Sequence, residues 1–71
     1  MTEVEYVGNK VREFRTQADM TQDELARSIG VSRQTIIAIE KSNYTPSVLL
    51  ALKLARTFNT SVENIFSYDK E

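Results

Sequence analysis

Apolar residues recur at helical spacing on both sides of Gly30, which divides the stretch from residue 22 to residue 40 into two parts. The apolar positions are Leu25 and Ile29 before the glycine and Val31, Ile36 and Ile39 after it. Each group places one apolar stripe along a helix. A glycine after such a stripe is typical of a helix C-terminus, because glycine adopts the left-handed conformation without a Cβ penalty. The pattern predicts two short helices joined by a tight turn.

Capping residues support both helix starts. Thr21 can accept a hydrogen bond from the first turn, and Glu24 three positions later completes a capping box. Ser32 can cap the second helix. Ala26 is small and lies one turn before the glycine, where two helices joined by so short a turn cross closely. These residues form one linked set and predict a compact two-helix motif at about residues 22–41.

Two further helices are predicted, one on each side of this motif. Apolar spacing indicates a helix at about residues 9–18 and a longer one from Pro46 to about Phe58. Proline is tolerated in a first helical turn, and Thr45 is a candidate cap. The longer helix is apolar nearly all round, and such a helix is buried on most sides. We therefore expect it to form the centre of the core.

The C-terminal part of the chain predicts a short fifth helix. Asn59 can end the long helix in the left-handed conformation, and Thr60 with Glu63 forms a candidate capping box for a helix at about residues 61–66. The segment 2–7 alternates in part and predicts a strand, with which the tail I-F-S-Y-D could pair as a two-stranded ribbon. The expected fold is therefore all-α, with one domain over residues 1–71 and five helices. The residue pattern does not decide whether the two ends form the ribbon.

Composition narrows the possible functions. The chain has 71 residues, 41% of them hydrophobic, with neither cysteine nor histidine, which excludes disulfides and the usual zinc sites. It also lacks a Gly-rich phosphate loop and a paired-carboxylate motif, so we expect no enzyme, metal or cofactor. No apolar run of 18 residues and no secretory pattern occurs, which favours a cytoplasmic protein without membrane contact.

The charge distribution bears on a nucleic-acid partner. The net charge is −1, but residues 8–58 hold eight basic and five acidic residues, a local charge of +3. The acidic excess lies at the two ends of the chain. This field is mild, so we expect weak non-specific binding and an affinity that depends on a dimer and on direct contacts.

The second helix of the motif carries polar residues that its core stripe does not use. Arg33 can bind guanine and Gln34 can bind adenine in bidentate fashion, whereas Thr35, Ile37 or Ala38 can touch a thymine methyl group. Alone, such residues are more often solvated surface residues. In a two-helix context they predict a helix that reads base edges in the major groove of DNA.

Five motifs run through most of the chain: T-Q-D-E-L-A, G-V-S-R-Q-T-I, I-E-K-S-N-Y-T-P-S, L-A-L-K-L-A and V-E-N-I-F. Over about residues 9–66 they resemble the helix-turn-helix domains of the phage repressor and Cro type, the XRE family. Within that group the chain is similar to short, stand-alone regulators of the cytolysin-repressor kind. The resemblance implies a dimer of five-helix subunits with a small terminal β-ribbon.

The resemblance also implies roles for single positions. Arg33 and Gln34 match the principal base-reading positions, and Ala38 matches a third that here has no hydrogen-bonding group. Arg15 and Glu40 match a partly buried ion pair that ties the first helix to the recognition helix; we interpret it as structural. The expected DNA backbone contacts are Gln22, Ser32, Lys41, Asn43 and Tyr44.

One domain of this size buries too little DNA surface for tight specific binding, so we expect a homodimer on a palindrome. The candidate dimer surface consists of Val62, Ile65, Phe66 and Tyr68, with Leu49 as a further candidate. The alternative is that Val62, Ile65 and Phe66 close the core of one subunit. A narrow amphipathic helix cannot bury them all inward, so we expect both roles.

The leading hypothesis is a sequence-specific transcriptional regulator, a repressor that occupies a promoter. No sensing mechanism for a small-molecule effector is visible. The competing hypothesis is a protein-interaction module such as an antitoxin, with DNA binding secondary. An antitoxin usually carries a disordered extension, and the short tails of about seven and five residues count against that function.

Overall fold

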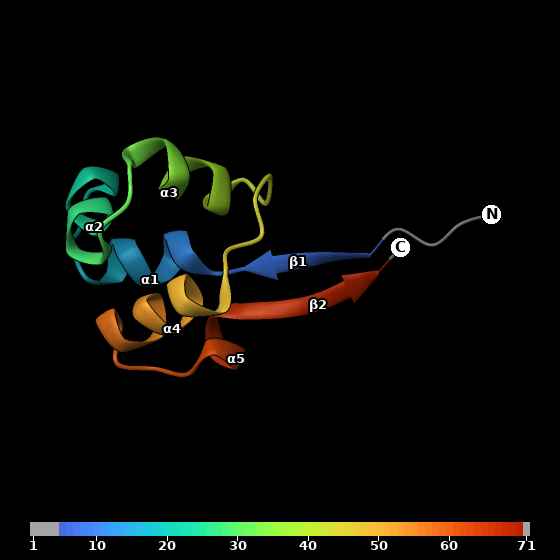
Figure 1. Ribbon diagram of the computed structural model, residues 1–71. Helices are drawn as coiled ribbons and strands as arrows, with labels where there is room; N and C mark the ends of the chain where they lie inside the picture. The colour runs from blue at the N-terminus through green and yellow to red at the C-terminus, as the bar shows by residue number, and fades with distance from the viewer. Residues whose placement is uncertain (1–4, 71) are drawn as a thin grey trace.

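The two ends of the chain pair with each other and project from one side of a group of helices (Figure 1). The structure, a computed structural model, describes residues 5–70, with side chains through residue 68. Within that range it contains five helices and a two-stranded antiparallel sheet. In chain order the elements are β1 (Glu5–Asn9), α1 (Val11–Gln17), α2 (Gln22–Ile29), α3 (Arg33–Glu40), α4 (Val48–Thr57), α5 (Val62–Ile65) and β2 (Phe66–Lys70).

The terminal ribbon, which the residue pattern left undecided and the family resemblance implies, is present in the structure. Val7 pairs with Tyr68, and Asn9 pairs with Phe66. Within the described residues the first strand runs from Glu5 to Asn9, so it continues two residues beyond the predicted end at Val7; the predicted strand residues 2–4 lie outside the described part. The Tyr68 hydroxyl donates a 2.6 Å hydrogen bond to the Glu5 carboxylate across the ribbon, which raises the pKa of Tyr68.

The core draws on every helix. Its largest fully buried side chains are Val11, Leu25, Ile36, Ile39, Leu54 and Ile65. Phe14 of α1 stacks on Phe58, just after α4, with ring centroids 5.7 Å apart. The stripes predicted on either side of the central glycine therefore meet inside the molecule, and together they fix the crossing of α2 and α3.

The local signals around α2 and α3 are confirmed. Thr21 and Glu24 form a complete capping box at the start of α2. Gly30 ends α2 in the left-handed conformation, with φ 76°. The Ser32 side chain accepts from the Thr35 amide and caps α3. Asn59 also takes the predicted left-handed conformation after α4, with φ 54°.

The prediction for α4 is wrong in two respects. The helix begins at Val48 with Ser47 as its cap, so Thr45 and Pro46 precede it instead of starting it. Its burial is also one-sided, since Leu50, Ala51, Leu54 and Ala55 are buried. Three of its large apolar side chains are exposed: Val48 at 77%, Leu49 at 64% and Leu52 at 55%. The physical reason is that α4 packs on α2 and α5 along one side.

The first and last helices are shorter than predicted. The helix α1 starts at Val11, whose amide donates to the Asn9 side chain. The helix α5 is a single turn capped by Ser61, which accepts from the Asn64 amide. The predicted capping box of Thr60 with Glu63 is wrong, because the Thr60 hydroxyl accepts instead from the Asn64 side chain.

Candidate nucleic-acid interface

The helix α3 has two faces with different environments. Ile36 and Ile39 on one face are fully buried. Arg33 and Gln34 in the first turn are exposed, whereas Thr35, Ile37 and Ala38 are half-buried. Arg33 and Gln34, the two principal predicted base-reading side chains, therefore face solvent at the helix N-terminus.

The start of α3 is held by a local hydrogen-bond pair. The Ser32 hydroxyl lies 3.2 Å from the Thr35 amide, which donates to it, and 3.0 Å from the Thr35 hydroxyl. Thr35 thus has its hydroxyl engaged with Ser32. Ser32 has a capping role here, and its predicted role as a backbone contact stays a prediction.

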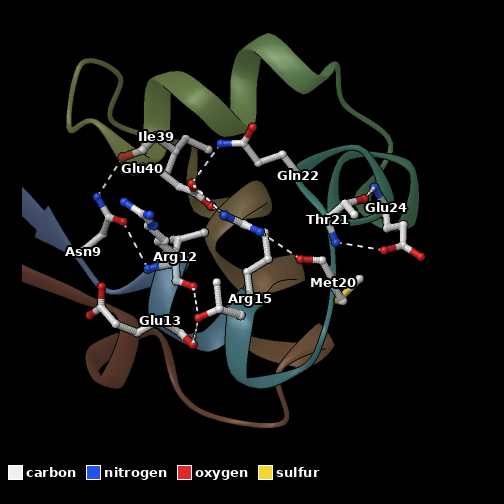
Figure 2. Close-up of polar contacts among 12 residues, drawn as sticks. Asn9, Arg12, Glu13, Arg15, Met20, Thr21, Gln22, Glu24, Ile39 and Glu40 are labelled. Carbon is white, nitrogen blue, oxygen red and sulfur yellow. Dashed lines mark hydrogen bonds and ion pairs between the residues drawn. The ribbon is translucent and has the colours of Figure 1, made fainter.

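A polar network around Glu40 ties three helices together (Figure 2). The Arg15 guanidinium Nε lies 2.7 Å from Glu40 Oε2, and their side chains are only 12% and 6% exposed. Gln22 Nε2 donates to Glu40 Oε1 at 3.1 Å, and Arg15 Nη1 donates to the Met20 carbonyl at 2.8 Å. The predicted pair of Arg15 and Glu40 is therefore present and links α1 to α3, while Gln22 braces it from α2.

Asn9 belongs to this framework but was missed as a functional position. Its side-chain nitrogen donates to the Ile39 carbonyl at 2.7 Å and to the Ser42 hydroxyl at 3.3 Å. Its oxygen accepts from the Val11 amide at the start of α1. One side chain thus joins β1, α1 and the end of α3. Its only sequence signal was its place at the predicted start of the first helix.

The loop after α3 presents the predicted backbone contacts to solvent. Lys41, Asn43 and Tyr44 are all exposed, and Tyr44 keeps 46% of its surface. Ser42 takes a positive φ of 60°, which turns the chain, and the Asn43 amide donates to the Ala38 carbonyl. The contacts of these residues with DNA stay predictions.

The predicted dimer surface divides into buried and exposed parts. The core role expected of Ile65 is confirmed, since it is 1% exposed and belongs to the hydrophobic core, and at that burial it is not available to the predicted dimer surface. Val62 and Phe66 pack against the core with part of their surface open, and Tyr68 is 66% exposed. Leu49 and Val62 line the same surface hollow, together with Leu52.

The described residues hold no cluster of three His, Cys, Asp or Glu side chains suited to a metal ion. Among them, no helix combines the length and the apolar character needed to cross a membrane.

The family model described as helix-turn-helix matches residues 11–65, most of the chain. The chain belongs to the helix-turn-helix family of the phage repressor and Cro type. It is accordingly a transcriptional regulator with a helix-turn-helix DNA-binding domain, in which α2, the turn at Gly30 and α3 form the motif.

Relatives and solved structures agree with this assignment. An uncharacterised HTH-type transcriptional regulator of Archaeoglobus fulgidus is 50% identical over 62 residues, which cover 87% of each chain. The transcriptional repressor RstR of a cryptic phage in Vibrio cholerae is 32% identical over 59 residues, covering 83% of this chain and 53% of RstR. The restriction-modification controller protein C.AhdI of Aeromonas hydrophila superposes with a TM-score of 0.70 at 28% identity, covering 76% and 82% of the two chains.

Proposed function

We propose that this regulator is a repressor that binds a palindromic operator as a homodimer, with one α3 helix of each subunit in the major groove. Arg33 and Gln34 read base edges, and Thr35, Ile37 and Ala38 supply apolar contacts. The DNA backbone is contacted by Gln22, Ser32, Lys41, Asn43 and Tyr44.

The observation that supports this proposal is that α3 has one buried face and one exposed face. One face is locked in the core by Ile36 and Ile39, while Arg33 and Gln34 stand exposed at the N-terminal turn. The N-terminal residues of a recognition helix are the ones that contact base edges in this motif. Because the network around Glu40 fixes α3 relative to α1 and α2, these side chains are presented from a rigid platform.

A homodimer accounts for the apolar surface on the α4 side. Leu49, Leu52 and Val62 line one hollow, and the exposed Val48 belongs to the first turn of the same helix as the two leucines. A second copy of the chain would remove these side chains from water. A two-fold dimer would also place two recognition helices about 34 Å apart, one turn of DNA. Binding to a promoter in this way would block polymerase, and RstR, a relative, is a repressor.

The first experiment is selection of bound duplexes from a randomised library at about physiological salt. We expect an enriched palindrome. Arg33→Ala should lose or relax one position in each half-site, at a cost of about 1–3 kcal/mol per half-site. The matched control is Arg27→Ala, which also removes an exposed arginine, from the last turn of α2. No enrichment would contradict the proposal and favour the protein-interaction module, such as an antitoxin.

The dimer has a separate test. Sedimentation of the wild-type protein should show a dimer at micromolar concentration, and Leu52→Lys should shift it toward the monomer with little change in helix content. A wild-type monomer at high micromolar concentration would contradict the homodimer while leaving DNA binding by α3 to the selection experiment.

A further inference from the structure

A surface hollow of about 730 Å³ lies between α1, the first turn of α2 and α3. It borders the exposed side of α3, since Arg33, Ile37 and Lys41 line it. Its basic lining residues are Arg12, Arg15, Arg33 and Lys41. Arg12 was given no role from the sequence, and Figure 2 shows its side chain extending from α1 toward α3.

The acidic residues of this hollow are already engaged. The Glu40 carboxylate accepts from Arg15 and Gln22 and is only 6% exposed. Asp23 accepts a 2.8 Å hydrogen bond from Arg27, on the next turn of α2. Their negative charges are therefore largely offset before a ligand arrives.

Three basic side chains in the hollow are available to bind a ligand. Among the side chains that the structure describes, no hydrogen bond or ion pair engages those of Arg12, Arg33 or Lys41. All three residues are exposed. Six charged residues line the hollow, four basic and two acidic, so its lining has a charge of +2.

We infer that Arg12 binds a phosphate of the DNA backbone in this hollow and so helps to set the position of α3 in the groove. The inference rests on the proposed function, because it assumes that α3 enters the major groove. A helix in that groove has phosphates along both sides, and the hollow runs along one side of α3. Arginine suits this ligand because its planar guanidinium fork can give two parallel hydrogen bonds to phosphate oxygens.

A phosphate contact differs from a base contact in what it does to binding. It carries no sequence information, so its loss weakens operator and random DNA alike. It also releases counterions, so each contact adds about 0.9 to the steepness of the plot of log affinity against log salt concentration. A solvated surface arginine would change neither quantity, and the two measurements together therefore decide the role of Arg12.

The experiment measures fluorescence anisotropy on the selected operator and on a random duplex, over a series of salt concentrations. The proteins are the wild type, Arg12→Gln, Arg12→Lys and the charge-matched control Lys10→Gln, which removes one exposed positive charge that lies outside the hollow. We expect Arg12→Gln to weaken binding to both duplexes and to lower the slope by about 0.9 per subunit. Arg12→Lys should keep most of the slope, because the charge remains, and Lys10→Gln should match the wild type.

Two results would overturn the inference. Equal slopes for Arg12→Gln and Lys10→Gln would mean that Arg12 binds no phosphate, while the proposed function would stand if the wild type still prefers its operator. A loss confined to the operator would mean that Arg12 reads a base. If the wild type binds neither duplex, both the proposed function and this inference are contradicted. Melting curves on each variant distinguish lost contacts from lost structure.

Discussion

The α2–α3 unit and the α4–α5 region have similar numbers of residues, but they differ in how well the sequence predicts their helix starts and caps. In the α2–α3 unit both caps and the left-handed turn occur at the predicted residues. In the α4–α5 region the helix starts shift, and the predicted caps give way to Ser47 and Ser61. Capping is a local property of a few neighbours, and it is well specified only where the flanking chain offers one good candidate.

The same two regions differ in burial. Leu25 and Ile29 of α2 and Ile36 and Ile39 of α3 are buried as predicted, because each helix is flanked by partners in the same chain. Val31, the fifth predicted stripe residue, lies in the turn before α3 and is half-buried. The apolar residues of α4 exceed what its partners cover, so Val48, Leu49 and Leu52 remain exposed. The difference teaches that hydrophobic pattern predicts which side chains can be buried, whereas the packing partners decide which ones are.

The largest expected effect is the loss of the polar network in the α2–α3 unit. Glu40→Ala should destabilise the fold by about 3–5 kcal/mol, because it leaves the mostly buried Arg15 charge without its partner. Urea unfolding measures the change. Arg27→Gln is the control, since it breaks the exposed Arg27–Asp23 pair and should cost under about 1 kcal/mol. Equal losses in the two variants would refute the structural role assigned to the Glu40 network.

A leucine pair on α4 tests the burial difference within one helix. Leu54 is fully buried, and Leu54→Ala should cost about 2–5 kcal/mol. Leu52 is 55% exposed, and Leu52→Ala should cost far less at concentrations where the chain is monomeric. Urea unfolding at low protein concentration compares the two. A large loss for Leu52→Ala there would show that a partner within the same chain covers it.

The turn between α2 and α3 comes next in size. Gly30→Val should cost about 1–3 kcal/mol, because a β-branched residue at φ 76° is strained. The cost is conformational, since a Cβ at this position would meet no atom within 4 Å. Gly30→Asn is the control and should lose less, because asparagine tolerates this region. An unchanged melting temperature for Gly30→Val would contradict the turn assignment.

The smallest effect concerns the cap of α2 and its dependence on pH. Hydrogen bonds from the Thr21 backbone and side chain lower the pKa of Glu24 below its ordinary value of 4.5. A lowered folded-state pKa gives stability that is present above the ordinary value and is lost as the pH falls through the lowered one. Glu24→Gln can keep the capping box but does not titrate. Its melting temperature should therefore fall less than that of the wild type between about pH 6 and about pH 3; parallel curves would contradict the contribution of Glu24.

The candidate site was predictable to the extent that it depends on one helix. Arg33 and Gln34 follow from their place after a cap and off the apolar stripe, and both are exposed. Arg12 and Asn9 were given no role from the sequence because their positions matter only beside distant segments: Asn9 bonds to Ile39 and Ser42, and Arg12, with the role proposed above, shares a hollow with α3. A hydrophobic pattern with a period of a few residues describes near neighbours and therefore cannot predict such long-range contacts.

The sequence by itself determined the two capped helices, the glycine turn, the stripes that form the core and, through family likeness, the ion pair. The tertiary structure alone decided that the two ends pair, that Ile65 is too fully buried to join the predicted dimer surface, and that three apolar residues of α4 face outward. It also decided that Asn9 ties β1 to α3 and that Arg12 lies in a basic hollow. The reason is that local structure depends on hydrogen bonds between near neighbours, whereas burial and surface charge depend on which distant segments come to lie against one another.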